Sequence, residues 1–214
     1  VYEALHGADK VKAQFEYLWN QHRHKIDPVL ESANGRIKTF QATIDKIQTK
    51  RLKLKKETAN GNPTPPYNID HVEDLIGFRF NTLFRSDCLQ VVDHLLRLIT
   101  CQPGYENNLF QENALKELIF YKPNSKPHAD DMPTLLTSLL KQHNCDPDAV
   151  LKTPEQKQSG YSSVHIVARL ADGNAHGGRG VGNIKGIVAI TGHRVGHVVR
   201  NKEAVALVVE VKPM

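Results

Sequence analysis

The chain has 214 residues, of which 40% are hydrophobic and 24% are charged. This ordinary globular composition excludes a disordered, collagen-like or coiled-coil chain, and the length suits one compact domain with appended helices. The longest apolar runs, such as 205–209, fall far short of the roughly 20 residues that cross a bilayer. The chain opens without the basic stretch and apolar core of a secretory signal, so we expect a cytoplasmic protein with no membrane partner.

The cysteines and the charges narrow the class of protein further. Three cysteines, none in a C-x-x-C motif, fit neither a disulfide framework nor a zinc knuckle, so we expect buried or incidental thiols. The net charge is +5, yet residues 36–57 alone hold eight Lys and Arg against two acidic residues. The positive charge is therefore concentrated in one segment.

The N-terminal part of the chain predicts two helices. Apolar residues at helical spacing indicate an amphipathic helix over about 8–30, after which Asn34-Gly35 breaks the chain. From Arg36 onward, apolar residues recur every three or four positions and predict a second helix with one core face and one cationic face. The proline-rich segment 60–66 is typical of a surface connection.

The remaining elements alternate between strands and helices. Residues 74–84 predict a strand, and 87–99 predict a helix with Ser86 as its N-cap, which together form a βα unit. Further segments with strand or helix periodicity are strands over 115–121, 161–170, 184–191 and 204–211 and a helix over 132–142. We expect an α/β (α+β) fold in which helices flank a mixed β-sheet.

The glycines are concentrated in the C-terminal third of the chain. Eight of the fourteen lie between Gly173 and Gly196, where no acidic residue occurs. We expect an N-terminal helical segment over 1–35 and one domain over 36–214, whose last third, 172–214, is rich in glycine.

The first candidate binding residues are cations at the head of the basic segment. Arg36, Lys38 and Lys46 would lie near the N-terminus of the second predicted helix. Cations beside the free N–H groups of a helix N-terminus attract phosphate, so the three residues together predict a polyphosphate site. The alternative is a solvated cationic helix face, which is the commoner meaning of a charge run.

The second candidate pair lies at the start of the 74–84 strand. Asp74 lies where the preceding loop enters the strand, and Arg79 lies within the strand. Magnesium often uses only one or two protein carboxylates beside nucleotide phosphates, and an arginine neutralises phosphate. The alternative is an aspartate that caps a turn and an arginine on a solvated strand face.

The third candidate group lies at the entry to the 161–170 strand. Lys157, Tyr161 and His165 surround a flexible glycine. Tyr161 would stack on a purine base, and His165 would hydrogen-bond a sugar or phosphate. The alternative is a tyrosine at a strand edge beside a histidine whose hydrogen bonds are satisfied within the protein.

Together, these three stretches resemble the synthetase domain of the RelA/SpoT family of alarmone synthetases, in the family's order and local spacing, over about residues 30–171. The resemblance implies a nucleotidyltransferase-like synthetase fold and a GTP diphosphokinase (GTP pyrophosphokinase) activity. In that reaction Mg²⁺ supports transfer of the β,γ-diphosphate of ATP to the 3′-hydroxyl of GDP or GTP. The products are AMP and the guanosine tetra- or pentaphosphate of the stringent response.

The resemblance also implies a role for each matched residue. The residues that would grip ATP are Arg36, Lys38, Lys46 and Arg79, and Asp74 would hold Mg²⁺. Tyr161 would stack on guanine, while Lys157 and His165 would contact the phosphates and ribose of the acceptor. The chain has no His-Asp dipeptide and no room before Arg36 for the family's hydrolase domain, so we expect an enzyme that only synthesises.

The C-terminal third departs from the family. A strand with a Glu-x-Gln signature usually follows the tyrosine motif, but here the first strand-like candidate is Glu210, with Lys212 in the place of the glutamine. Either a glycine-rich insertion separates the two strands and Glu210 is the catalytic and metal-binding glutamate, or that glutamate is absent.

Two other functions stay open. One is a toxin-like relative that transfers diphosphate to the 3′ end of tRNA, with the cationic helix as its RNA contact. The other is a catalytically silent nucleotide-binding or regulatory domain. Small members of the family form homo-oligomers through helices, so a homo-oligomer is a further expectation from the resemblance.

Overall fold

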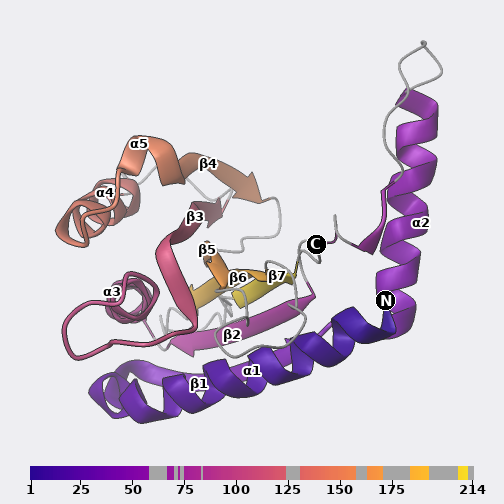
Figure 1. Cartoon of the computed structure of the whole chain (residues 1–214). Coiled ribbons are helices and arrows are strands. Elements are labelled where there is room, and N and C mark those ends of the chain that lie inside the picture. The colour runs from indigo at the N-terminus through magenta and orange to yellow at the C-terminus, as the bar shows by residue number, and fades with distance from the viewer. Residues whose placement is uncertain are drawn as a thin grey trace, which may run out of the picture.

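The computed structural model describes residues 1–57, 67–69, 72, 75–82, 84–123, 131–157, 163–170, 184–192 and 207–211. Its centre is a seven-stranded sheet in the order β1-β2-β7-β6-β5-β3-β4, in which β2 also pairs with β6 (Figure 1). The strands are β1 (Leu30–Ile37), β2 (Ile76–Thr82), β3 (Phe110–Pro123), β4 (Leu151–Lys157), β5 (Ser163–Leu170), β6 (Ile184–Gly192) and β7 (Leu207–Val211).

The sheet is mixed. The pairs β2–β6 and β3–β4 run parallel, and the other neighbouring strands run antiparallel. The helices are α1 (Tyr2–His22), α2 (Phe40–Glu57), α3 (Arg85–Ile99), α4 (Met132–Gln142) and α5 (Pro147–Val150), with short 3-10 turns η1 (Arg23–Lys25) and η2 (Asp27–Val29). The predicted fold class, a mixed sheet flanked by helices, is confirmed.

One face of the sheet carries the core. Along β2 the alternate residues Ile76, Phe78 and Phe80 are buried, and α1 lies lengthwise below β1 and β2 (Figure 1). The Phe15 and Trp19 rings of α1 each lie 4.3 Å from a β2 ring, those of Phe78 and Phe80 respectively. The helix therefore covers this face with aromatic contacts, which contribute beyond the apolar area that they bury.

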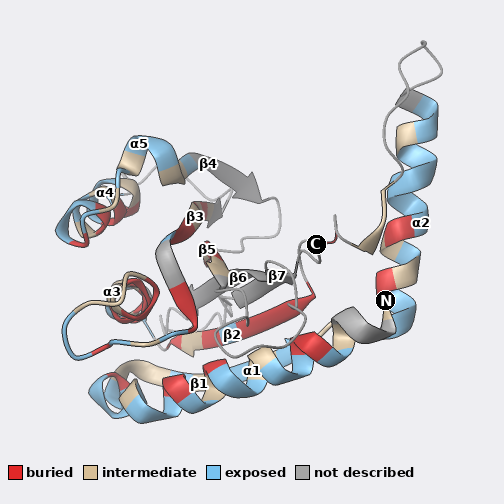
Figure 2. Cartoon of the chain, viewed as in Figure 1, coloured by how far each residue is buried: buried red, intermediate tan, exposed pale blue. Residues whose placement is uncertain are grey.

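Helices α3 and α4 extend the core, whereas most of α2 lies outside it. The buried stripe of α3 joins the same core, and α4 adds its buried residues Met132, Leu136 and Leu140 beside α3. Figure 2 shows buried positions gathered on β2, α3 and α4, whereas α2 is mostly exposed and extends away from the sheet. None of the helices that the structure describes is long and apolar enough to cross a membrane.

Gly35 lets α1 approach the sheet closely. A Cβ atom at this position would lie 2.6 Å from Cε1 of Phe78 and 2.8 Å from Oε1 of Glu16. Real Cβ atoms do not approach this closely, so the site requires glycine for space. The same Asn34-Gly35 pair that suggested a chain break lies inside β1.

Two predictions for the N-terminal part are wrong. The predicted helix over 8–30 ends at His22, and residues 30–37 form β1 instead of a helix–break–helix sequence. These residues have little intrinsic strand preference, but pairing with β2 from Leu30 to Ile37 stabilises the extended conformation. The second helix begins at Phe40, where the Thr39 hydroxyl accepts a hydrogen bond from the N–H of Ala42.

The later elements agree better with the predictions. The predicted helix over 132–142 is α4, and the strands predicted over 74–84, 161–170, 184–191 and 204–211 are β2, β5, β6 and β7 with small shifts at their ends. Ser86 lies inside α3 and is not its N-cap; the Asp87 carboxylate instead accepts a hydrogen bond from the N–H of Phe84. Strand β4 and helix α5 were not predicted. The three cysteines are free thiols, as expected.

Candidate active site on the second face of the sheet

The second face of the sheet carries polar and cationic residues. On β2, Arg79 is exposed and Asn81 is half-buried, in alternation with the buried core residues. The Asn81 amide Nδ2 donates a hydrogen bond to the Ser32 hydroxyl on β1, at 2.6 Å. The helices that contact the sheet through the core, α1 and α3, lie on the opposite face. Arg79 therefore points away from the core, as the predicted alternation requires.

The register brings Arg79 and His165 into one row. Arg79 of β2 pairs with Ala189 of β6, and Ala189 also pairs with His165 of β5. Residues in register on neighbouring strands share a face, and two strand spacings separate the two Cα atoms by about 10 Å. Residues predicted from two separate motifs thus lie on one face of the sheet, close enough for a nucleotide to contact both.

The ring of His165 lies beside the ring of Tyr121. Its ring lies 4.4 Å from the ring of Tyr121 in an edge-on arrangement, with 67° between the planes. Tyr121 pairs with Ser163 and lies two residues from Ile119, which pairs with His165. The Tyr121 ring therefore restricts the orientation of the imidazole on this face.

Additional cations occupy the same side of the sheet. Arg36 pairs with Gly77 and is exposed, and Arg169 pairs with Lys185 of β6. Gly77 lies two residues from Arg79, and Arg169 lies four residues from His165. Because side chains alternate along a strand, Arg36 and Arg169 are on the same face of the sheet as Arg79 and His165. Arg169 and Tyr121 were not among the predicted site residues, although the alternation within 161–170 had placed Arg169 on the same strand face as His165.

The predicted placement at a helix N-terminus is wrong for Arg36, which lies in β1, whereas Lys38 lies in the connection just before α2 and Lys46 lies within α2. Phosphate binding by these three residues stays a prediction. The N–H of Lys38 donates to the carbonyl of Leu75 at 2.8 Å and extends the pairing of β1 with β2 by one residue. Lys46 is half-buried near the start of α2. The cations come from three different elements.

The start of β2 also lies beside β7. Ile76 pairs with Val209, so Glu210 follows at the register position next to Leu75. Asp74, the residue before Leu75 in the sequence, lies outside the described residues, and of Glu210 only the backbone in β7 is described. Among the described side chains no group of three or more His, Cys, Asp or Glu residues is placed to hold a metal ion.

Two of the remaining predicted residues, Lys157 and His165, lie on strands that pair with β3. Lys157 is the last residue of β4 and pairs with Pro123, while the nearby Tyr121 pairs with Ser163 at the start of β5. Lys157 and His165 therefore come to the same end of the sheet. Tyr161 lies outside the described residues, and the side chain of Lys157 is not described.

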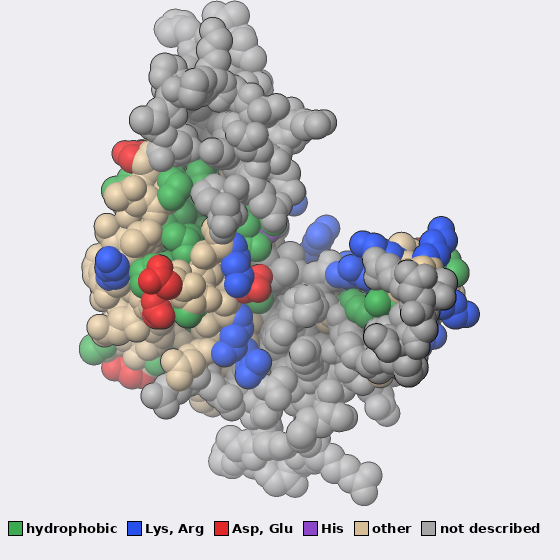
Figure 3. Space-filling view, turned by 90° about the horizontal axis from the view of Figure 1, so that it is seen from above, with side chains coloured by type: hydrophobic (Ala, Val, Ile, Leu, Met, Phe, Trp, Pro, Cys, Tyr) green, Lys and Arg blue, Asp and Glu red, His purple; other side chains and the backbone are tan. Residues whose placement is uncertain are grey.

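A separate cationic surface covers α2. The helix carries six Lys and Arg residues against Asp45 and Glu57, and Figure 3 shows their side chains gathered over it on the right of the view. Phe40 and Leu52 on the same helix are 53% and 61% exposed. The described part of α2 thus presents positive charge and apolar side chains away from the sheet.

Three solved structures resemble this chain. They are a protein of Streptococcus mutans UA159 (smu.1046c), the small alarmone synthetase 1 of Bacillus subtilis bound to its product pppGpp, and a GTP pyrophosphokinase family protein of Streptococcus pneumoniae. The sequence identities are 17%, 16% and 17%, and the TM-scores are 0.42, 0.40 and 0.39. The alignments cover 88%, 86% and 88% of this chain but 67%, 66% and 66% of the others, so the chain spans about two thirds of their length. The sequence matches no protein-family model and no curated protein sequence.

Proposed function

We propose that the protein transfers the β,γ-diphosphate of ATP to the 3′-hydroxyl of GDP or GTP. The observation that carries this proposal is the row Arg79–Ala189–His165, which joins the donor and acceptor motifs on one sheet face. Their separation of roughly 10 Å suits a nucleotide bound across the strands between them. Phosphoryl-group transfer depends mainly on positioning the two substrates and neutralising the phosphate charge. A cationic sheet face can supply both.

The cations divide between the two substrates in this proposal. Arg36 and Arg79, on adjacent strands, would neutralise the triphosphate of ATP, with Lys38 and Lys46 closing the site from beyond β1. Arginine suits this task because its planar guanidinium binds two phosphate oxygens at once. On the acceptor side, Tyr161 would stack on guanine, and Lys157 and His165 would hold its phosphates and ribose.

Asp74 and Glu210 would hold Mg²⁺ beside the start of β2. The donor set fits this ion, which prefers carboxylate oxygens and takes its other ligands from water and phosphates. Bound there, Mg²⁺ would supply charge neutralisation to the phosphates. Glu210 lies at the register position next to Leu75, the residue that follows Asp74, although the two acids are 136 positions apart in the sequence.

The proposed transfer needs no reactant other than ATP and GDP or GTP. The acceptor 3′-oxygen forms a bond to the β-phosphorus of ATP while the bond from that phosphorus to the α,β-bridging oxygen breaks. AMP leaves, and the hydroxyl proton passes to a base, for which Glu210 is the candidate. The protein's part is to align the hydroxyl with the β-phosphorus and to keep the charge compensated.

The test is to incubate the full chain with ATP, Mg²⁺ and either GDP or GTP and to separate the products by anion exchange. We expect AMP to appear in equal amounts with a more highly charged guanosine nucleotide. Asp74→Asn should abolish both products, whereas Asp9→Asn, a matched change at an exposed position of α1, should not. Binding of ATP and GDP without turnover in the wild type would refute the proposal and favour a silent nucleotide-binding domain.

The cationic surface of α2 favours a second candidate function, transfer of diphosphate to the 3′ end of tRNA. Exposed cations on a protruding helix suit contacts with RNA phosphates, whose binding weakens steeply with salt. In this case the logarithm of the tRNA binding constant should fall linearly with the logarithm of salt concentration. The double variant Lys50→Gln and Lys56→Gln should reduce that slope by about one to two. Equal transfer to GDP with and without tRNA competitor would exclude this function.

A further inference from the structure

A second concave site lies on the side of the molecule opposite the proposed active face. It is a cavity of about 460 Å³ between η1, α3, α4 and the loop that follows α3. Its wall includes Lys25, Leu89, His94, Arg97, Tyr105 and Leu139. Because α3 packs on the core face of the sheet, this cavity is separated from Arg79 and His165 by the sheet itself. Its volume is in the range of small-molecule sites.

Aromatic contacts fix one wall of the cavity. The His22 ring stacks on Tyr105 at 4.7 Å, and the Lys25 ammonium lies 3.9 Å from the centroid of the Tyr105 ring. Within the described part of the chain, no carboxylate lies within salt-bridge distance of Lys25. The positive charge of Lys25 is therefore held at the cavity by an aromatic ring rather than cancelled by an acid.

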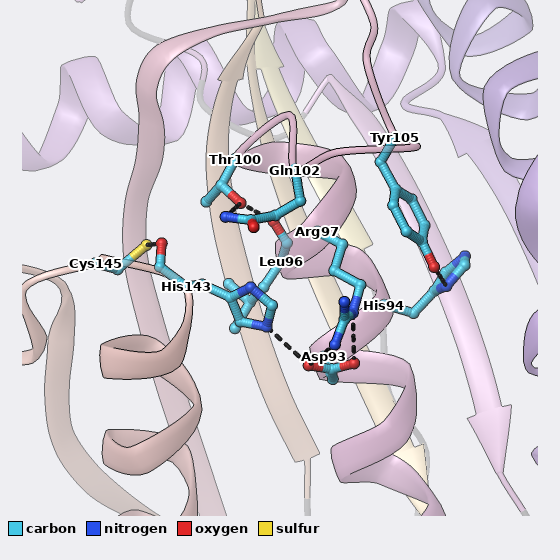
Figure 4. A network of polar contacts seen from close by, with 9 residues as sticks. All are labelled: Asp93, His94, Leu96, Arg97, Thr100, Gln102, Tyr105, His143 and Cys145. Atoms are coloured by element: carbon cyan, nitrogen blue, oxygen red, sulfur yellow. Dashed lines mark hydrogen bonds and ion pairs between the residues drawn. The ribbon is translucent and has the colours of Figure 1, made fainter.

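The acid in the cavity wall is already compensated. Figure 4 shows Asp93 between Arg97 and His143. Its carboxylate accepts from Nε and Nη2 of Arg97 at 2.9 and 3.4 Å and lies 2.7 Å from Nε2 of His143. These bonds leave Nη1 of Arg97 outside the pair. The cavity thus presents Lys25 and a remaining edge of Arg97 to a ligand, with a net positive charge.

A buried imidazole provides a further polar group. The His94 side chain is 2% exposed, and its Nδ1 lies 3.3 Å from the Tyr105 hydroxyl (Figure 4). Its other ring nitrogen, Nε2, is buried and has no hydrogen-bond partner among the described residues. Burial and the nearby charges of His22 and Lys25 lower the pKa of His94 to about 4, so the ring is neutral at physiological pH. The neutral ring and the Tyr105 hydroxyl thus form a polar part of the cavity wall.

We propose that this cavity binds a small organic anion, a phosphate or carboxylate group on a compact apolar body. The anionic group lies between Lys25 and the outer edge of Arg97, and the apolar body packs against Leu89 and Leu139. A neutral compound of the same shape gains only the apolar contacts, and inorganic phosphate gains only the polar ones, so neither binds as well. This binding does not depend on the proposed diphosphate transfer.

The test uses phenyl phosphate and benzoate as probes, with benzyl alcohol and inorganic phosphate as the neutral and ring-free counterparts. Binding to the full chain is followed by NMR, through the ring signals of His94 and Tyr105. We expect both organic anions to shift these signals in a saturable 1:1 manner, and the stronger response of one of them identifies the preferred anionic group. Benzyl alcohol and inorganic phosphate should leave the two rings nearly unchanged at the same concentration.

Two variants test the position of the anion. Lys25→Gln should weaken binding about tenfold, and Gln90→Trp, at an exposed position of the wall, should block the cavity. Lys10→Gln, an exposed change elsewhere on the N-terminal helix, is the matched control and should bind as the wild type does. Equal shifts from benzyl alcohol, unchanged binding by Lys25→Gln, or shifts confined to His165 would each overturn the proposal.

Discussion

Asp93 and His143 are fifty residues apart in the sequence, yet Oδ1 of one lies 2.7 Å from Nε2 of the other (Figure 4). Asp93 lies in α3, and His143 is the residue that ends α4. Since His143 is buried and Asp93 also pairs with Arg97, one carboxylate joins two helices and compensates two nitrogen donors. This contact holds α4 against α3 and shapes one wall of the cavity.

Replacing this carboxylate should destabilise the protein. Asp93→Asn is expected to lower the free energy of unfolding by about 1–3 kcal/mol at pH 7, because His143 and Arg97 lose a charged acceptor. Burial raises the pKa of Asp93, but its bonds to Arg97 and His143 outweigh burial and bring the pKa below its ordinary value. The ionised carboxylate thus stabilises the fold above about pH 4, and that contribution is lost as the pH falls below this value. Urea unfolding at pH 7 and pH 3.5 checks this, and a difference from wild type that does not shrink at the lower pH would contradict it.

His94 should make stability depend on pH in a different window. Burial, followed by the charges of His22 and Lys25, lowers its pKa from 6.5 to about 4 in the folded protein. The unfolded chain therefore binds more protons between these values, so stability should decline from about pH 6.5 down to about pH 4, by on the order of 3 kcal/mol. Burial, followed by the charge of Lys25, also lowers the pKa of His22, which adds to the same trend.

The variant that isolates this effect is His94→Gln. It should be less stable than wild type at pH 7 but should lose less stability between pH 6.5 and 4.5, because the titrating ring is gone. Denaturant unfolding at four pH values across this window measures both slopes. Parallel slopes for the two proteins would show that other groups cause the decline.

Gly35 should tolerate no side chain. Gly35→Ala is expected to cost about 1–3 kcal/mol, because the new methyl group would press on the Phe78 ring and on the Glu16 side chain. Gly104→Ala provides the comparison, since nothing lies within 4 Å of that site but its φ is +78°. There only backbone strain applies, about 1–2 kcal/mol, and Gly104→Asn should recover part of it. Equal stability of Gly35→Ala and wild type in thermal unfolding would contradict the close packing of α1 on β1.

Arg79 should matter for activity and not for folding. Its side chain is exposed on the sheet face opposite the core, so Arg79→Gln should change the free energy of unfolding by less than about 0.5 kcal/mol. If Arg79 neutralises ATP phosphates, the same change should lower kcat/KM by about 100-fold, the cost of a charge-assisted contact to phosphate. Steady-state kinetics with ATP as the varied substrate provide the measurement, with Lys10→Gln as the control. Wild-type kcat/KM in Arg79→Gln would remove this residue from the site.

Much of the fold is encoded locally. The apolar stripes of α3 and α4 and the alternation in β2 and β5 predicted these elements with their buried faces, because side-chain period follows directly from backbone geometry. The alternation also placed Arg79 and His165 on the polar faces of their strands. Strand β1 could not be predicted this way, since its residues Leu30–Ile37 form a strand through pairing with β2, 47 residues later in register at Ala33–Phe80.

The residue types and motif spacings, which depend on the sequence alone, were enough to nominate the cations, the acids and the histidine of the candidate site. Their arrangement depends on strand order. Arg79 and His165 meet across β6, and Glu210 comes next to Leu75 through β7, because hydrogen bonds between distant strands set the register. The cavity beside His94 has the same origin, since its wall combines η1, α3, α4 and the loop after α3. Contacts between segments so far apart arise from packing and have no counterpart in local sequence periodicity.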